Sequence, residues 1–446
     1  MSPPPRVRLV VLNYNGGDLT SRCVRHLERL DWPADRLEIV VVDNASADGS
    51  DQLLEQRPRV ELIRSPRNTG FPANNLALRD LDGVDFVGLV NNDAFAEPDF
   101  LQPLVDALDS DERIGAACPR IVLAPRFVDL RIASPAEQPP GDGRQLGVRI
   151  SGVEVDDKDC WRSTVFADGV HHPERGTPAE PEFRWCGGEA LVRVPVPVDA
   201  PPTKVRVRVA SIRTLQATFD GGAGPVEAEV GPEPVWVDVP LGGEPYDVVN
   251  NVGSLLVEGG YGADRGFLEP DRGQFDEPAD VFAWCGAGVL FNVDYLREIG
   301  LFDERFFMYY EDTDMAWRGR ARGWRYRYVP TSKLRHVHSA TSVEGSPLFQ
   351  HYVERNRLVM LTKNAARRLA VGAVVRYLLI TASYARRDVV MPLLRGRRPT
   401  FGLLRARLRS FLAYLRMVPE LLSDRRRLRA TQTVHDEAIS SWAVKP

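Results

Sequence analysis

Carboxylate and imidazole side chains stand at a few points where this sequence could do chemistry. Asp43 and Asp93 each follow an apolar run, Glu311 and Asp312 open a helical pattern, and His336 comes 24 residues after Asp312. Hard divalent cations such as Mg²⁺ or Mn²⁺ take oxygen ligands, and a few carboxylates plus substrate phosphates can hold one. A carboxylate within hydrogen-bond reach of a hydroxyl can take its proton as a general base. These residues are therefore candidates for metal binding and proton transfer.

Each of these residues also has a purely structural interpretation. An Asp at the end of a strand is often a turn former or a helix N-cap. The acids Glu311, Asp312 and Asp314 suit the first turn of a helix, whose dipole would also keep Asp312 ionised. His336 and His338 share one face of a strand pattern, but a zinc site would need further ligands that the sequence does not place nearby. They could equally be polar residues at a strand end, or His338 could lie near a phosphate.

The elements that must position these residues begin with a strand–helix alternation near the N-terminus. Apolar, β-branched runs of strand length alternate with helical patterns, which indicates a mostly parallel sheet covered by helices. Ligands bind at the carboxyl ends of strands in such sheets. Polar clusters follow three of the runs, so they should converge on one site. The expected strands are 7–13, 37–43, 60–64 and 84–90, the expected helices are 19–30 and 73–81, and the polar clusters are 13–15, 43–46 and 91–93.

The pattern changes in the middle of the chain and then returns. Residues 130–248 are rich in Pro and Gly and contain short alternating runs, which predicts an inserted antiparallel β-sandwich. Its Trp161, Trp185 and Trp236 could form a sugar-stacking platform, although such aromatics are mostly core residues. After residue 250 the α/β character resumes, and residues 349–429 are helical by pattern. The expected regions are 1–129, the insert 130–248, 249–362 and a basic helical region 363–446.

Composition and charge limit the partners. The net charge of -4 argues against nucleic acid, but residues 363–430 hold 17 Lys/Arg and 3 Asp/Glu. Such a basic helical region could lie on an anionic membrane or pack as a bundle on the catalytic part or on a second subunit, forming a homo-oligomer. Five scattered cysteines, no signal-peptide pattern and no window of ~18 uninterrupted apolar residues predict a cytoplasmic protein, or one peripheral on the inner face of the plasma membrane.

Several long motifs occur in a fixed order. VLNYN, VVDNASADGS, RNTGFPANN and NNDA are followed by the stretch from DRGQFDEPAD to FFMYYEDTDMAWR and then by RHVHSATS. Together they resemble family 2 glycosyltransferases of the GT-A fold, in the branch that contains bacterial rhamnosyltransferases and galactofuranosyltransferases. The resemblance covers 7–125 and 250–365, about half of the chain, and does not extend to the insert.

The resemblance implies roles for particular residues. Asp312, with Glu311, matches the acidic pair that contains the catalytic base. Asp93 matches the second acid of the family's Asp-x-Asp metal motif, in which this chain has the amide Asn91 in the first position, and His336 matches a histidine that completes the metal site. The implied donor-binding residues are Asn13, Tyr14, Asp43, Asn44, Arg67, Asn68, Gly70, Asn75, Asn92 and Asp93, and the acceptor or sugar-binding residues are Trp284, Gly286 and Arg318.

These matches imply an inverting glycosyltransferase that uses Mg²⁺ or Mn²⁺. The donor would be a nucleotide-diphosphate sugar, with rhamnose as first choice and a UDP-hexose or UDP-galactofuranose as the alternative. The acceptor would be a glycan or lipid-linked glycan in cell-envelope polysaccharide synthesis. A non-catalytic glycan-binding protein that kept the fold is the alternative from another class, and the amide Asn91 is the feature that favours it.

Overall fold

The computed structural model describes residues 3–177, 180–198, 203–337 and 346–445. The chain forms two compact units, of which unit 1 comprises 1–124, 249–267 and 272–446. Unit 2 comprises 125–248 and 268–271, so its main segment starts five residues before the expected boundary at 130. Residues 363–446 belong to unit 1 rather than forming a compact unit of their own.

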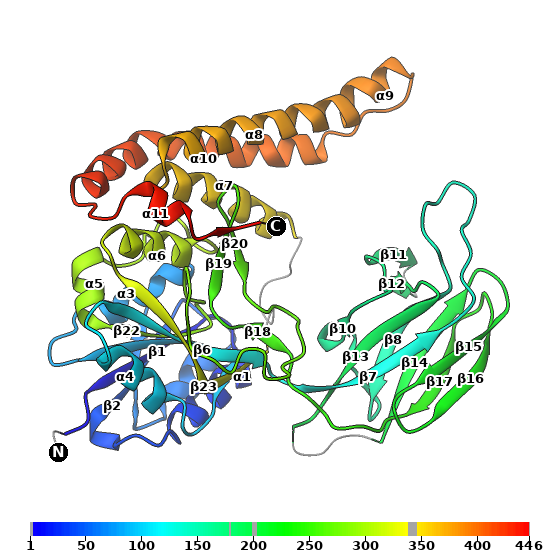
Figure 1. Ribbon diagram of the computed structural model, residues 1–446, viewed down its shortest axis with the longest axis horizontal. Helices are drawn as coiled ribbons and strands as arrows, with labels where there is room; N and C mark the ends of the chain where they lie inside the picture. Colours follow the sequence, from blue (N-terminus) through cyan, green and yellow to red (C-terminus); the bar gives the residue numbers. More distant parts are fainter. Residues whose placement is uncertain (1–2, 178–179, 199–202, 338–345, 446) are drawn as a thin grey trace. The chain divides into compact units, whose positions relative to one another are not determined.

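A sheet with packed helices forms the centre of unit 1, as the strand–helix alternation predicts, but it is mixed rather than mostly parallel (Figure 1). Its order is β21-β23-β6-β22-β4-β1-β2-β3, with β18 beside β6 and β5 beside β23. β1, β2, β3 and β4 run parallel, whereas β22 lies antiparallel between β4 and β6. The strands are β1 Val7–Asn13, β2 Leu37–Asp43, β3 Val60–Arg64, β4 Phe86–Asn91, β5 Ala94–Ala96, β6 Ile114–Leu123, β18 Val249–Asn251, β21 Ala279–Asp280, β22 Gly288–Asn292 and β23 Arg325–His336.

Helices pack on this sheet, and two separate buried clusters form the core of unit 1. The expected helix 73–81 is instead a 3₁₀ turn at Phe71–Asn74 followed by the short α3, because Pro72 and Asn74 favour a tight turn. The helices are α1 Gly17–Leu27, α2 Ser50–Glu55, α3 Asn75–Leu78, α4 Leu101–Asp109, α5 Val293–Ile299, α6 Glu311–Ala321 and α7 Pro347–Asn364; a 3₁₀ turn spans Ala34–Arg36.

The parallel register brings the predicted polar clusters to one edge of the sheet. Asn13, the last residue of β1, is paired with Asp43, the last residue of β2. β4, the other neighbour of β1, ends at Asn91, and Asp93 follows two residues later. The antiparallel β22 starts at Gly288 opposite Val90, which places the Gly286 turn beside the same edge. Apolar strand residues fix this register, and the strand ends then carry the polar residues.

Unit 2 consists of two antiparallel sheets with a valine-rich core, as period-2 alternation predicts. Trp161, Trp185 and Trp236 are outside the fully buried core, and Trp236 lies on Arg206 with 38% of its surface exposed. One sheet contains β7 Arg126–Ala133, β10 Val165–Phe166, β13 Glu189–Val196, β15 Leu215–Asp220 and β16 Pro225–Val230; the other contains β8 Val148–Val155, β9 Lys158–Asp159, β11 Glu174–Thr177, β12 Glu180–Trp185, β14 Lys204–Ser211 and β17 Val235–Pro240, and a 3₁₀ turn spans Trp161–Ser163.

The C-terminal part of unit 1 is a helical hairpin that packs on α7 (Figure 1). A continuous helical stretch, Arg367–Leu394, is long and apolar enough by length and composition to cross a membrane. Its apolar residues are interrupted by arginines, so it does not contain the ~18 uninterrupted apolar residues used as the criterion in the sequence analysis. Only 17% of its most apolar window is buried. The hairpin contains α8 Arg367–Ala385, a π-helical segment Arg386–Val390, α9 Met391–Leu394 and α10 Gly402–Ala430; α11 Asp436–Ser440 follows, and β24 Ala443–Val444 completes a small sheet with β19 Ser254–Val257 and β20 Tyr261–Asp264.

Candidate active site

Asp43 is the buried carboxylate at the end of β2, and its neighbours on β1 and the following turn hold it in place. The Asn13 amide donates to Asp43 Oδ1 at 2.8 Å and to Ser50 Oγ at 2.9 Å, while its oxygen accepts from Thr20 Oγ1 at 2.7 Å. Asn13 is fully buried, so its predicted contact with the donor is wrong. It instead orients Asp43, which stays a candidate for binding the nucleoside.

The turn from Arg67 to Gly70 is fixed by Asn44. The Asn44 amide donates to Asn68 Oδ1 at 2.9 Å and to the Gly70 carbonyl at 3.1 Å, and its oxygen accepts from the Thr69 N–H at 2.9 Å. Gly70 has φ +73°, and a Cβ there would lie 1.9 Å from the Phe307 carbonyl oxygen. The turn therefore requires glycine. Arg67 in this turn is exposed, and so is Tyr14, the residue after β1.

Asp93 and His336 come together as the predicted metal pair. The two side chains are buried, and Asp93 Oδ1 lies 3.1 Å from His336 Nε2. The other ring nitrogen, Nδ1, lies 2.8 Å from Asn250 Oδ1, which can only accept a hydrogen bond. With Nδ1 protonated, Nε2 presents its lone pair next to a carboxylate oxygen. Two acceptors so close together suit a divalent cation, so these residues fit the implied metal.

The amides of the Asn91-Asn92-Asp93 segment have separate roles. Asn91 Nδ2 lies 3.4 Å from His336 Nε2, whereas Asn92 Nδ2 donates to Thr20 Oγ1 at 3.1 Å. Within the described parts of the chain, no group of three or more His, Cys, Asp or Glu could hold a metal by itself. A metal at Asp93 and His336 would therefore need phosphate or water oxygens to complete its coordination, as Mg²⁺ usually does. His338 lies outside the described residues.

Asn250 is a positioning residue that the sequence patterns did not indicate, and it gives a testable expectation. Because its oxygen fixes the protonated nitrogen of His336, Asn250→Ala should lower the affinity for Mn²⁺ about 10-fold to 100-fold. Titration of Mn²⁺ by electron paramagnetic resonance, with a nucleotide diphosphate present, measures this. Asn251→Ala is the matched control, since the Asn251 amide binds Asp264 and Ser254 instead. Equal losses in both variants would contradict the assigned role of Asn250.

The three acids at the start of α6 differ in their partners. Asp314 is fully buried and neutralised by Arg318 Nε at 3.1 Å and Lys363 Nζ at 2.8 Å. Among the residues that the structure describes, Glu311 and Asp312 form no ion pair, and Glu311 Oε2 is buried without a hydrogen-bond partner. Only Asp314 thus fits the purely structural interpretation. Glu311 and Asp312 therefore remain candidates for proton transfer.

Burial shifts the protonation of this pair. It raises the pKa of Asp312 to about 6, against the hydrogen bonds from Thr313, which lower it. Burial and the charge of Asp312 hold the pKa of Glu311 well above its usual range. The helix was expected to be amphipathic, with a dipole that keeps Asp312 ionised; α6 is instead almost wholly buried, and the pKa of Asp312 rises to about 6, which still leaves it mostly ionised at pH 7. Desolvation outweighs the dipole here.

A strained loop presents these carboxylates. Phe307, Tyr309 and Tyr310 all have φ between +65° and +69°, which is unfavourable for bulky residues. The fully buried Asn356 of α7 holds this loop, because its amide lies within 2.7–2.8 Å of the carbonyl oxygens of Phe306, Met308 and Tyr309. Sequence patterns did not single out Asn356. Its only sequence signal was a polar residue at an inward position of α7.

A third carboxylate, Asp264 at the end of β20, faces the same region. After burial, the charges of Asp264 and then Asp312 raise the pKa of the Cys285 thiol, so both carboxylates lie near the Gly286 turn. Asn251 donates to Asp264, directly after Asn250 binds His336. Two adjacent asparagines of β18 therefore support the metal side and the carboxylate side of one site. In the sequence, the signal for these two roles is the pair of adjacent asparagines, Asn250-Asn251.

The structure gives three predicted ligand contacts other roles. Trp284 is fully buried against Phe291 and Phe302, so it is a core residue and cannot stack on a sugar. Arg318 is buried and directs its guanidinium at Asp314 and at the carbonyl groups of residues 299–301. The side-chain amide of Asn75 is used by the backbone of Phe302: its Nδ2 donates to the Phe302 carbonyl, and its Oδ1 accepts from the Phe302 N–H.

Gly286 differs from those three, because it stays at the site. A Cβ there would lie 2.9 Å from the Phe71 ring.

Family models match two segments of the chain. Residues 9–146 match the model for glycosyl transferase family 2, and residues 241–415 match the model for glycosyl transferase family group 2. The matched segments contain Asp43, Asp93, Glu311, Asp312 and His336. Together with the observed sheet, the match confirms the predicted GT-A fold. It does not single out the rhamnosyltransferase and galactofuranosyltransferase branch.

A curated relative is the beta-monoglucosyldiacylglycerol synthase of Synechocystis sp., 34% identical over 112 residues. The aligned part covers 23% of this chain and 23% of the relative. Similar solved structures include GalNAc-T7 with UDP, GalNAc and Mn²⁺ (TM-score 0.44, 12% identity, 92% of this chain and 55% of that chain). Another is the mannosyltransferase PcManGT of Pyrobaculum calidifontis with GDP-Man and Mn²⁺ (TM-score 0.37, 15% identity, 99% and 79%).

Proposed function

We propose that this protein, which carries a family 2 glycosyltransferase domain of the GT-A fold, moves a sugar from a nucleotide-diphosphate donor to a hydroxyl of a glycan or lipid-linked glycan. The observation that carries the proposal is the Glu311–Asp312 pair, two carboxyl groups at a helix start that no cation neutralises in the described part of the chain. Desolvated carboxyl groups without a neutralising partner are typical of catalytic sites, where they act as acids or bases. Such a pair therefore suits a base that takes the proton of an acceptor hydroxyl.

In the proposed reaction, Asp312 takes the proton of the acceptor hydroxyl while that oxygen attacks the anomeric carbon and the bond to the diphosphate breaks. Burial and the charge of Asp312 raise the pKa of Glu311, which favours its protonated form, and in that form it would act as a hydrogen-bond donor. Asp43 binds the nucleoside. A divalent ion held by Asp93 and His336, when bound, would neutralise charge on the leaving diphosphate. The single displacement inverts the anomeric configuration.

Rhamnose on a deoxythymidine diphosphate is our first choice of donor sugar, and it rests on the order of motifs alone. A UDP-hexose or UDP-galactofuranose is the alternative. The name of the curated relative refers to a glucosylated diacylglycerol, which supports a lipid-linked acceptor for this chain as well. We place the reaction in the synthesis of cell-envelope polysaccharide.

Thermal-shift measurements with a panel of nucleotide sugars test the proposal. A ligand that binds only the folded state raises the melting temperature, because it adds to the free energy of unfolding; the gain is about 2.7 kcal/mol at a ligand concentration 100 times the Kd. The largest shift is expected with dTDP-rhamnose in the presence of Mn²⁺ or Mg²⁺. A second assay then measures the transfer of radiolabelled sugar from that donor to lipid extracts. A shift with UDP sugars alone would select the alternative donor. No shift with any nucleotide would favour the non-catalytic glycan-binding protein.

The raised pKa of Asp312 predicts the pH dependence of turnover. The base must be deprotonated, so kcat/KM should fall about tenfold per pH unit below the pKa of about 6 and level off above it. Initial rates measured from about pH 5 to about pH 8, with the donor at low concentration, report this ionisation of the free enzyme. A profile that stays flat down to about pH 5 would show that a group other than Asp312 accepts the proton.

A further inference from the structure

The two long helices of the C-terminal hairpin each carry an exposed apolar stripe. On α8 the stripe consists of Val371, Val375, Leu378 and Leu379, which lie at helical spacing and are 45–67% exposed. On α10 it consists of leucines that are 44–53% exposed, namely Leu408, Leu412, Leu415 and Leu422. We call these two stripes together the hairpin face.

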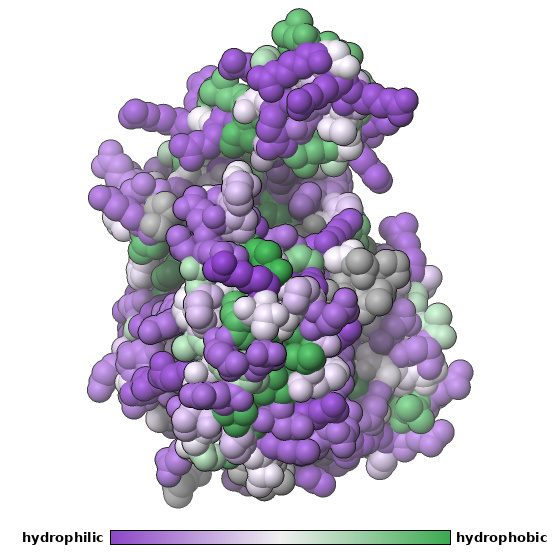
Figure 2. Space-filling model, turned by 90° about the vertical axis from the view of Figure 1, so that its right-hand side faces the viewer, coloured by the Kyte–Doolittle hydropathy of each residue, from purple (hydrophilic) through white to green (hydrophobic). Residues whose placement is uncertain are grey.

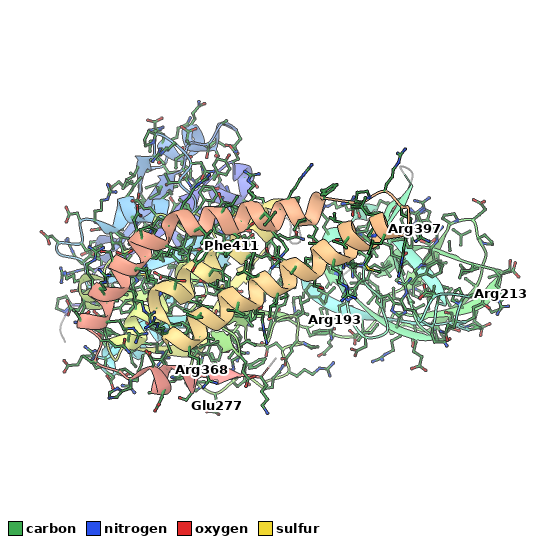
Figure 3. The ribbon with its side chains drawn as sticks, turned by 90° about the horizontal axis from the view of Figure 1, so that it is seen from above. Arg193, Arg213, Glu277, Arg368, Arg397 and Phe411 are labelled. Carbon is green, nitrogen blue, oxygen red and sulfur yellow. The ribbon has the colours of Figure 1, made fainter. Side chains whose placement is uncertain are left out.

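The opposite stripes of both helices are already occupied. Tyr377 of α8 stacks on Phe411 of α10 at 5.6 Å, and its hydroxyl donates to the Arg407 carbonyl at 2.8 Å. Arg407 Nε donates to Thr381 Oγ1 at 2.9 Å, and Tyr414 bonds to Thr362 of α7. Figure 3, seen from above, shows α8 and α10 side by side with Phe411 between them. The residues of the hairpin face therefore take no part in these contacts, which join α8 to α10 and α10 to α7.

The turn between the helices extends this surface. Leu393, Leu394 and Phe401 are 58%, 76% and 40% exposed, and exposed arginines stand among them, with Arg397 at the end of the hairpin (Figure 3). Figure 2, with the hairpin at the top, shows hydrophobic residues interleaved with hydrophilic ones there. Exposed apolar area next to unpaired cations distinguishes this surface from an ordinary solvated helix.

The charge of the hairpin is mainly positive, because its arginines far outnumber its three acids, Asp388, Glu420 and Asp424. In the described part of the chain, most exposed arginines of the hairpin form no ion pair. The exceptions are Arg387, whose partner is the neighbouring Asp388, and Arg427, whose partner is Asp424. The buried Arg407 is paired with Glu354. The exposed arginines without such a partner are Arg367, Arg368, Arg376, Arg386, Arg395, Arg397, Arg398, Arg405, Arg409, Arg416 and Arg426.

We propose that the hairpin face and its turn bind the surface of a bilayer that contains anionic phospholipids. Leucine and valine side chains would enter the boundary between headgroups and acyl chains while the arginines bind lipid phosphates. A second copy of the chain is a poor occupant, because two hairpin faces would bring like charges together. Crossing the bilayer is also disfavoured, since α8 is hydrogen-bonded to Arg407 and carries Arg376 near its centre.

The test is cosedimentation of the whole chain with lipid vesicles. We expect binding to vesicles of phosphatidylcholine with phosphatidylglycerol, little binding to phosphatidylcholine alone, and loss of binding at about 1 M salt, where the screening length is roughly 3 Å. Binding to neither vesicle would overturn the proposal. Binding that persists at about 1 M salt would overturn the charge-dependent mode.

Two pairs of variants separate the apolar and charged contributions. Leu379→Glu with Leu412→Glu should abolish binding, whereas the control Leu53→Glu, equally exposed on α2, should not. Arg376→Gln with Arg405→Gln should weaken binding roughly 25-fold, since each arginine near the surface contributes about fivefold. The control Arg29→Gln with Arg162→Gln changes the same net charge elsewhere.

Sedimentation equilibrium on the same proteins checks the competing occupant. A dimer that the Leu379→Glu, Leu412→Glu variant dissociates would show that a second copy covers the face and would overturn the proposal. The inference does not depend on the proposed function. Thermal shifts with nucleotides report the donor site separately, and the hairpin variants should leave them unchanged.

Discussion

Replacing Asp312 by asparagine is expected to lower kcat by roughly 10²-fold to 10⁴-fold, the contribution of a general base. The amide keeps the shape of the side chain and can still accept from Thr313, as Asp312 Oδ1 does. It cannot take a proton at any accessible pH. Nucleotide binding should survive, because Asp43 and Asp93 are untouched. Steady-state turnover of the donor, with nucleotide affinity measured in parallel, distinguishes these effects.

Glu311→Gln is the matched control for that result. Because burial and the charge of Asp312 raise the pKa of Glu311 and so favour its neutral form, glutamine preserves both the shape of that form and its ability to donate. We therefore expect a much smaller loss than for Asp312→Asn. A variant Asp312→Asn that kept more than about a tenth of the native kcat would remove Asp312 from the role of base. A greater loss in Glu311→Gln would transfer that role to Glu311.

Asp93→Ala is expected to abolish the stabilisation that a metal adds to nucleotide binding. Removing a direct ligand should weaken metal binding by more than the 10-fold to 100-fold typical of residues behind the ligands. His336 would then offer Nε2 alone. The shift in melting temperature with a nucleotide diphosphate, compared with and without Mn²⁺, measures the loss. The control Asp99→Ala removes an exposed carboxylate from the same segment and should leave both shifts intact.

Asp43→Ala separates metal binding from nucleoside binding. Asp43 is held by Asn13 and by the Ser46 N–H at 3.1 Å, without contact to the metal pair in the described hydrogen bonds. Its loss should weaken nucleotide binding equally with and without Mn²⁺. If Asp93→Ala behaved in the same way, the metal assignment would fail while the donor site stood.

The strands and the positions of the main acids could be predicted from sequence because their causes are local. The runs 7–13, 37–43 and 60–64 are strands with the expected bounds, since β-branched residues and turn residues at their ends act over a few positions. A parallel sheet then brings its strand ends to one edge. Asp43 and Asp93 lie where this reasoning placed them, whereas the place of His336 beside Asp93 was implied by the family resemblance.

The partners of each polar group were decided by the tertiary structure. Asn13, Asn75 and Arg318 have the right residue types to bind a ligand, but their hydrogen bonds are used by neighbours distant in sequence. The same holds in reverse for Asn250 and Asn356, which no local pattern marked and which hold His336 and the strained loop.

By itself, the sequence determined the order of elements, the inserted β region and the residues that could carry charge. Only the tertiary structure decided which charges are neutralised. Asp314 meets Lys363 and Arg318, whereas Asp312 is desolvated, and its pKa rises to about 6 despite the helix dipole. The physical reason is range: secondary-structure preferences act between neighbours in the chain, but desolvation and ion pairing depend on everything packed around a group.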